Sequence, residues 1–430
     1  MGVGMVLLFF IATNRLTVNW AEQETKRVRQ KLFVYSLVLR LCWVTGSYFL
    51  YFSTTGKPFE FAAADSVAYH DTARWLSSYN PVRVLKILVE SKGGGVSDVG
   101  YTWYLTLLYS LVGTELLIPR IIKAVLSAYM VVLVHKLAQR NFGEDVARMA
   151  GVLTMLMPNL IYYNGLHLKE SEMVFITVWF IERADALFRS SRMNLRGITT
   201  VLLLTGVLFT FRTVLGITAI FSVSTALLLS KKSNSNTTNR LFFMVWVVLA
   251  SVTLAGGRIA GEIEEIWESR NQNQQRSYEW RSSRRDGNAF ARYASTAYLA
   301  PTIFIVPFPT MVKVDTQQNQ MLLHGGNYVK NVMAFFVFVA FLRLIKHQKW
   351  RDHLLLLTFT MGYLIIVAFS SFAHSERFHL PALPLLLILS AYGIENMTPS
   401  LKRLFTPYLV LLMILIAGWS WFKLAGRGLV

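Results

Sequence analysis

The chain has 430 residues, of which 54% are hydrophobic and 16% are charged, and its mean hydropathy is +0.42. Because the apolar residues form long runs, this composition excludes a soluble globular protein and predicts an all-α polytopic membrane protein. The net charge of +19 comes from 43 Lys and Arg against 24 Asp and Glu. Basic cytoplasmic loops facing an anionic leaflet explain this excess better than nucleic-acid binding does.

The single cysteine, Cys42, lies within an apolar run. One cysteine excludes an internal disulfide and a thiolate metal cluster, and we expect a buried structural thiol.

The apolar runs predict about 11 transmembrane helices, since a span needs roughly 17 to 25 mostly apolar residues. The expected spans are residues 32–52, 117–139, 147–163, 172–187, 198–212, 214–230, 241–257, 330–346, 353–373, 378–396 and 404–423. The earlier apolar stretch, residues 5–12, is short, and no cleavage-type site follows it. We expect it to form a membrane-surface or partial helix.

Basic residues occur in alternate loops and so predict the orientation of the chain. They precede the first span, follow the second and fourth, and return in residues 231–240, 343–351 and 402–403. These loops are expected in the cytoplasm of a single transmembrane domain over residues 1–430. The opposite face then holds a first extracytoplasmic loop, residues 53–116, with interfacial helices, and a large one, residues 258–329. Short cytoplasmic loops and the absence of a retention signal at residues 428–430 favour a bacterial plasma (inner) membrane.

Asp65 opens a polar stretch, residues 65–73, directly after the first expected span. A carboxylate beside a bilayer is costly unless it has partners or a task, so such acids mark candidate sites. The surrounding residues 61–79 suit a helix along the membrane surface. Asp65 is also placed where an N-cap residue of that helix would stand, which is the structural alternative.

Cations at the outer ends of spans could bind an anionic head group. We expect Arg377 first, followed by Lys169 and Arg212, and Arg377 shares its turn with His374 and Glu376. The alternative is that these long side chains only reach for water. Arg284 and Arg285 belong to a bunch of arginines in the large outer loop, where they could contact a phosphate or pair with glutamates of the same loop.

Histidines and acids in the outer loops leave a divalent metal open. Glu170 and Glu172 are two residues apart at the start of a helix, so they should point to different faces. His70 beside Asp71, and His167 near Glu170, could complete a site, although a lone histidine is more often a satisfied polar residue. The sequence therefore gives no support for a metal cofactor.

Several features occur in an order that resembles the GT-C superfamily of polytopic glycosyltransferases, such as protein O-mannosyltransferases and the aminoarabinose transferase of lipid A. They are Asp65-x-x-x-Tyr69-x-x-x-Ala73, residues 113–120 ahead of the second span, Asn141-Phe-Gly143, Pro158 followed by Tyr162 and by Lys169-Glu170, and residues 377–384. The resemblance covers most of residues 30–400 as an ordering of loose motifs. The chain departs from it in lacking a clear Asp-x-Asp in the first loop.

The resemblance implies a GT-C-like membrane fold and transfer of a sugar from a polyprenyl-phosphate-linked donor to a glycan, lipid or protein acceptor outside the cytoplasm. Asp65 is similar to the catalytic carboxylate of that superfamily, which acts as general base, while cations hold the departing phosphate. The expected substrate-binding residues are Tyr69, His70, Asp71, Lys169, Glu170, Arg212, Arg284, Arg285, His374, Glu376 and Arg377.

Two other functions fit a polytopic chain of this kind. A polysaccharide polymerase or O-antigen ligase-like enzyme would use arginine and histidine of the outer loops, and Asp65 would be dispensable. A lipid or small-molecule transporter would require no donor lipid. Against the transporter, the sequence shows no internal repeat and no matching pair of spans broken by Gly or Pro.

Overall fold

The computed structural model describes residues 2–61, 63–190, 194–229, 302–311, 318–370, 373 and 375–425, together with positions 244 and 248. Within these ranges every regular element is a helix, which confirms an all-α protein. The expected span at 241–257 and most of the expected loop at 258–329 lie outside the described residues.

Seven stretches of the described residues are long and apolar enough to cross a membrane, so the protein is a multi-pass membrane protein. They contain the helices α1 (Gly2–Asn19), α2 (Thr25–Thr55), α6 (Leu117–Phe142), α14 (Gln318–Lys346), α15 (Leu354–Phe369), α17 (Leu383–Glu395) and α18 (Pro399–Ala425). The short helices η5 (Trp350–His353), α16 (Glu376–His379) and η6 (Leu380–Ala382) extend the spans of α15 and α17. Within the described residues the expected count of about 11 is not reached.

The difference in count has physical causes. The apolar helices α10 (Leu195–Phe211) and α11 (Thr213–Leu229) have 17 residues each, at the lower limit of a span. Helix α9 (Glu170–Arg189) has 20 residues but carries Glu182, Arg183 and Asp185 in its second half. Helix α1 adds a candidate span that was not expected. Residues 5–12 belong to this 18-residue helix, which is longer than the partial helix that we expected.

Proline breaks the expected span at 147–163 into α7 (Glu144–Leu156), α8 (Pro158–Tyr162) and the 3-10 turn η1 (Tyr163–Gly165). Pro158 has no N–H, so the carbonyl of Thr154 loses its partner in the helix. The fully buried Arg40 of α2 replaces that donor, with hydrogen bonds to the carbonyls of Thr154 (3.4 Å) and Met155 (3.3 Å). Arg40 also donates to Oγ of Ser127 on α6 at 2.8 Å, so it ties three elements together.

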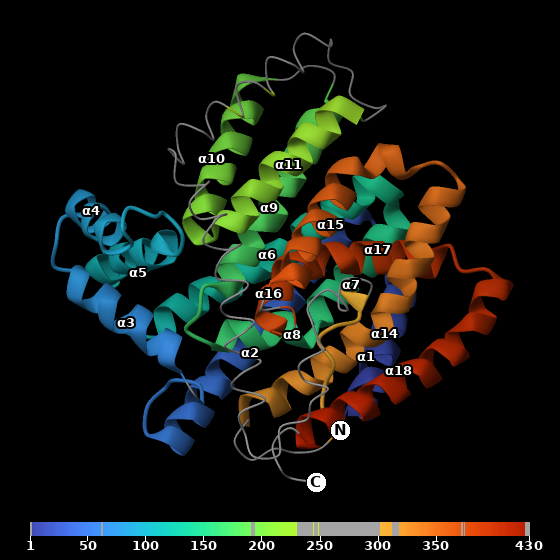
Figure 1. Cartoon of the computed structure of the whole chain (residues 1–430), viewed down its shortest axis with the longest axis horizontal. Helices are drawn as coiled ribbons and strands as arrows, with labels where there is room; N and C mark the ends of the chain where they lie inside the picture. The colour runs from blue at the N-terminus through green and yellow to red at the C-terminus, as the bar shows by residue number, and fades with distance from the viewer. Residues whose placement is uncertain are drawn as a thin grey trace.

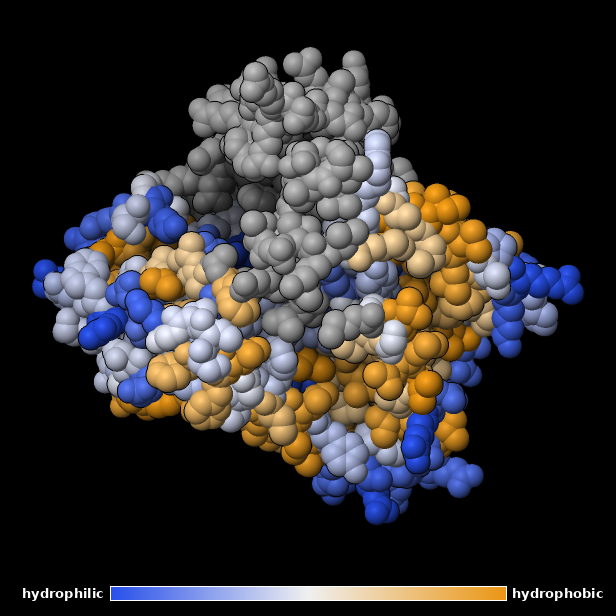
Figure 2. Space-filling model, turned by 90° about the horizontal axis from the view of Figure 1, so that it is seen from below, coloured by the Kyte–Doolittle hydropathy of each residue, from blue (hydrophilic) through white to orange (hydrophobic). Residues whose placement is uncertain are grey.

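Large apolar side chains cover the outer surfaces of the bundle (Figure 2). Leu8 of α1, Phe49 of α2 and Ile414 of α18 are all mostly exposed, as lipid-facing residues are. Cys42 is exposed on α2 as well, so the expectation of a buried thiol is wrong. The reason is that α2 buries only one stripe, which runs through Leu32, Val44 and Tyr51.

The expected first extracytoplasmic loop, residues 53–116, contains α3 (Ala64–Leu76), α4 (Pro81–Ser91) and α5 (Val99–Val112), which lie at one side of the bundle (Figure 1). Leu76, Val84, Leu88 and Val99 form a small core between these helices. The expected surface helix within residues 61–79 is α3. Helix α5 has only 14 residues and was expected to be interfacial rather than spanning.

The ends of α6 and α9 that were predicted to be cytoplasmic contact each other through ion pairs. Arg140 at the end of α6 pairs with Glu182 (2.8 Å) and Asp185 (3.1 Å) of α9. Arg189 pairs with Asp185 at 2.8 Å and donates to Oδ1 of Asn141 at 2.7 Å. The described residues therefore agree with the alternation of basic loops.

Candidate functional site

Asp65, Glu170 and Arg377 meet at the opposite end of the bundle, and we call them the outer ion cluster. Arg377 Nη1 lies 2.5 Å from Oδ2 of Asp65, and its Nε lies 2.6 Å from Oε1 of Glu170. The Glu170 side chain is fully buried, whereas those of Arg377 and Asp65 are 26% and 56% exposed. One arginine thus holds a buried and an accessible carboxylate at once.

The local structure shows how these side chains come together. Asp65 is the second residue of α3, whose N-cap is Ala63 and whose cap makes no side-chain hydrogen bond. The capping alternative for Asp65 is therefore wrong, although a carboxylate in the first turn still favours the helix dipole. Glu170 opens α9, and Arg377 lies in α16 at the start of the span that continues into α17, so the cluster joins three distant parts of the chain.

Lys169 and Arg212 lie beside the outer ion cluster and differ in their partners. Lys169 is buried, pairs with Asp98, and donates to the carbonyl of Phe211 at 3.1 Å. Arg212 stacks on the ring of Phe378, 4.2 Å from the centroid, and its Nη1 lies 3.5 Å from the hydroxyl of Tyr363. In the described part of the chain no carboxylate lies within 4.0 Å of Arg212.

Glu376 points away from the outer ion cluster although it precedes Arg377 directly. It is buried and accepts hydrogen bonds from the side-chain amides of Asn159 on α8 and Asn327 on α14. Nearby, the Nζ of Lys330 lies 2.9 Å from Nδ1 of His379. This network packs α14 against α8 and α16, so Glu376 does not join Asp65 in one site. The expected site residues Arg284, Arg285 and His374 lie outside the described residues.

Tyr69 and His70 lie on the inner side of α3, while Asp71 lies on its exposed side. The ring of Tyr69 is 5.0 Å from that of Tyr101 on α5. Nδ1 of His70 lies 2.8 Å from the hydroxyl of Tyr109, which lies 3.1 Å from Nε2 of His167. His70 and His167 thus belong to a hydrogen-bonded chain rather than to a metal site.

Burial keeps both histidines neutral. It lowers the pKa of His70, against the opposing effect of Asp71. Burial, followed by the charge of Lys123, lowers the pKa of His167 well below its ordinary value. Neutral imidazoles can accept or donate within this chain without bringing further positive charge to the site.

We expect the stability of the protein to fall on acidification because of His167. A histidine with a lowered pKa in the folded state stabilises the protein above its unfolded pKa of about 6.5, and this contribution is lost as the pH falls further. The slope from one such group is at most about 1.4 kcal/mol per pH unit. Thermal unfolding between about pH 7.5 and 5.5 should show a smaller slope for His167→Gln than for the wild type. The exposed His347→Gln is the control and should leave the slope unchanged.

No group of three or more His, Cys, Asp or Glu side chains in the described residues lies close enough to hold a metal ion. Glu170 and Glu172 contact different cations, as their spacing predicted: Glu170 pairs with Arg377, while Glu172 lies 3.6 Å from Lys123 on α6.

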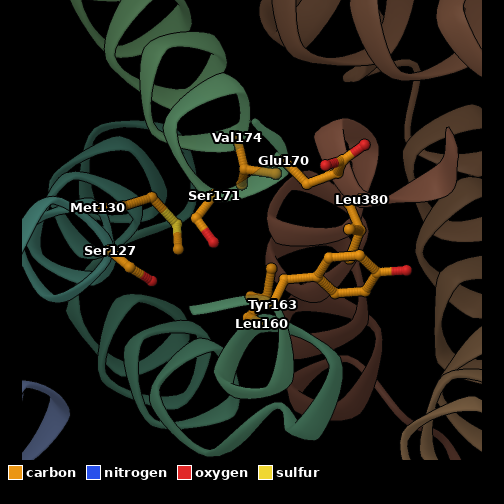
Figure 3. Close-up of a pocket in the computed structure, with 8 residues that line it drawn as sticks. All are labelled: Ser127, Met130, Leu160, Tyr163, Glu170, Ser171, Val174 and Leu380. Atoms are coloured by element: carbon orange, nitrogen blue, oxygen red, sulfur yellow. The ribbon is translucent and has the colours of Figure 1, made fainter. Parts of the chain in front are cut away.

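A small cavity of about 10 Å³ lies at the start of α9 (Figure 3). Figure 3 shows the hydroxyl of Ser171 pointing into it, with Ser127 and Met130 opposite and the Glu170 carboxylate at its edge. Oγ of Ser171 is buried without a partner, and the volume is about that of one water molecule. This cavity suits a bound water rather than a substrate.

Sequence reasoning missed three residues of this region, Tyr101, Arg120 and Lys123. Arg120 and Lys123 are fully buried near the start of α6, within a run that was read as an apolar span. Charged residues inside a span are the signal that could have found them.

Searches with protein-family models and against curated proteins each found no match to this sequence.

Proposed function

We propose that this protein is an integral membrane glycosyltransferase that moves a sugar from a polyprenyl-phosphate-linked donor to an acceptor on the extracytoplasmic side. Asp65 acts as the general base that takes the proton of the acceptor hydroxyl. The observation that carries the proposal is the contact between Asp65 and Arg377, 2.5 Å apart at the end of the bundle away from the basic loops.

Such a reaction needs a base and a group that stabilises the charge of the departing phosphate. Asp65 is the accessible carboxylate of the outer ion cluster, so an acceptor can approach it. Glu170 is fully buried and serves to hold Arg377 in place. Glu170 therefore holds the cation Arg377 in place, while the base Asp65 stays accessible to the acceptor.

Arg212 is the better candidate for the first contact with the donor phosphate, although the sequence favoured Arg377. Arg377 already binds two carboxylates, and Lys169 pairs with Asp98. Among the described residues Arg212 contacts an aromatic face and a tyrosine hydroxyl but no carboxylate, so its charge is the least compensated of the three there. Arginine also offers the planar fork that phosphate oxygens accept in a bidentate manner.

Mass spectrometry of lipids extracted with the purified protein tests the proposal. We expect a polyprenyl phosphate or its glycoside in the extract, and less of it from Arg212→Gln than from the wild type. Finding only bulk phospholipids in both extracts would contradict the proposed donor. Substrate uptake into liposomes that lack any donor lipid would instead identify a transporter.

A further inference from the structure

A second group of buried polar side chains lies next to the outer ion cluster, near the N-terminal ends of α5, α6 and α9. We call it the inner polar cluster and define it as Glu60, Tyr101, Tyr104, Arg120, Lys123, His167 and Glu172. Except for Tyr104, which is partly buried, each of these residues is buried. Neither the proposed base nor the proposed phosphate contacts belong to this cluster.

Short distances show that these side chains surround one region. Nζ of Lys123 lies 5.7 Å from the ring centroid of Tyr101 and donates to the carbonyls of Leu166 and Leu168, the two neighbours of His167. The ring of Tyr101 is 6.2 Å from that of Tyr104 and 6.4 Å from that of His167. The charge of Glu60 acts on Arg120 as well.

Many polar atoms of the inner polar cluster are buried without a hydrogen-bond partner among the described residues. They are Oε2 of Glu60, the hydroxyls of Tyr101 and Tyr104, Nε and Nη1 of Arg120, Nδ1 of His167, and both carboxylate oxygens of Glu172. Such atoms are rare in folded proteins, because each one without a partner costs about 1–3 kcal/mol. Their concentration in one place indicates that a group other than the described residues supplies the missing partners.

Arg40 provides a comparison within the same chain. Like Arg120, it is a fully buried arginine, and in the described residues no carboxylate lies within 4.0 Å of either guanidinium. All three nitrogens of Arg40 have hydrogen-bond acceptors. Arg120 uses only Nη2, which donates to the carbonyl of Pro58 at 2.6 Å. Every guanidinium nitrogen of Arg40 therefore has an acceptor, whereas Nε and Nη1 of Arg120 have none among the described residues.

The missing partner must both donate and accept hydrogen bonds. A phosphate offers only acceptors to Glu60 and Glu172, and an ammonium group offers only donors to Arg120. The formal charges of the cluster also balance, with Arg120 and Lys123 against Glu60 and Glu172, so a charged ligand would upset that balance. Hydroxyl groups meet both requirements, and the tyrosine rings offer apolar faces for the C–H side of a sugar ring.

We infer that the inner polar cluster binds an uncharged sugar. The inference rests on the proposed function, because sugar transfer is what would bring a sugar to this cluster. It adds that the transferred sugar is uncharged. The ring contact between Tyr69 and Tyr101 places the cluster directly beside Asp65 and Arg377, since Tyr69 follows Asp65 by one helical turn.

Binding of methyl glycosides to the full-length protein in lipid nanodiscs tests the inference. The probes are methyl glucoside, mannoside and galactoside as neutral sugars, a methyl glucuronide as the anion and a methyl glucosaminide as the cation. Three or four new hydrogen bonds correspond to a Kd of about 1 mM, so titration to about 100 mM suffices. We expect saturable stabilisation by at least one neutral glycoside and no stabilisation by the charged ones.

Tyr101→Phe and Tyr104→Phe each remove one hydroxyl that has no partner among the described residues, so the protein without sugar should stay folded. Each variant should weaken binding by about tenfold. Tyr129→Phe, on an exposed part of α6, is the matched control and should bind as the wild type does.

Unchanged affinity in Tyr101→Phe and Tyr104→Phe would overturn the inference. So would equal binding of charged glycosides, or the absence of any glycoside binding to the wild type, which would mean that water alone fills the cluster. A protein that binds neutral glycosides and transfers none would contradict only the proposed function. Sugar transfer that is unaffected by both tyrosine variants would contradict only this inference.

Discussion

Replacing Asp65 with Asn is expected to lower the rate of sugar transfer by about 10²–10⁴-fold, the usual contribution of a general base. The amide keeps the shape of the side chain and can still accept a hydrogen bond from Arg377, but it cannot take a proton from an acceptor hydroxyl. Because Asp65 is 56% exposed, the substitution should change stability little. The measurement is single-turnover transfer from a polyprenyl-phosphate sugar by purified protein.

The control for this prediction is Asp71→Asn. Asp71 is also an exposed aspartate of α3, on the face away from Arg377, so the variant changes the charge of the same helix without touching the outer ion cluster. Transfer at close to the wild-type rate is expected. Equal rates for Asp65→Asn and the wild type would remove the assignment of the base and favour a mechanism that depends on arginine and histidine.

The sequence predicted which residues share an end of the bundle better than it predicted the spans. Basic loops are a strong signal because each cluster must lie on one face, and the pairing of Arg140 and Arg189 with α9 agrees with it. Span counting failed where a helix was interrupted at Pro158, or where α9 carried charges that pair inside the bundle. Those charges are compensated by tertiary contacts that hydropathy cannot register.

The candidate site was predictable in part. Asp65 and Arg377 could be placed at the same end of the bundle, because each follows an outward-running span. The contact between Asp65 and Arg377, which are 312 positions apart in the chain, could not be predicted. It could not be predicted either that Glu376 accepts a hydrogen bond from Asn159 and does not join the outer ion cluster. Adjacent residues such as Glu376 and Arg377 point to different neighbours of a short helix, and only packing decides which neighbours these are.

The stability of the outer end should depend strongly on Arg377. Replacing Arg377 with Met would leave the carboxylate of Glu170 fully buried and without its cation. Breaking a buried ion pair in this way costs about 3–5 kcal/mol, because the desolvation of the remaining charge is no longer compensated. The measurement is unfolding by denaturing detergent, followed by the loss of helical structure. Lys86→Met, which breaks an exposed pair with Glu90 on α4, should cost less than about 1 kcal/mol.

A double-mutant cycle separates electrostatics from packing in this prediction. Glu170→Gln removes the buried charge, so Arg377→Met should cost much less in that background than in the wild type. We expect the double variant to be more stable than the sum of the two single effects by at least about 1 kcal/mol. Strict additivity would show that Arg377 acts by filling space. In that case the charge of Glu170 would not hold Arg377 in place. The proposal that buried Glu170 positions Arg377 while accessible Asp65 acts as the base would then be contradicted.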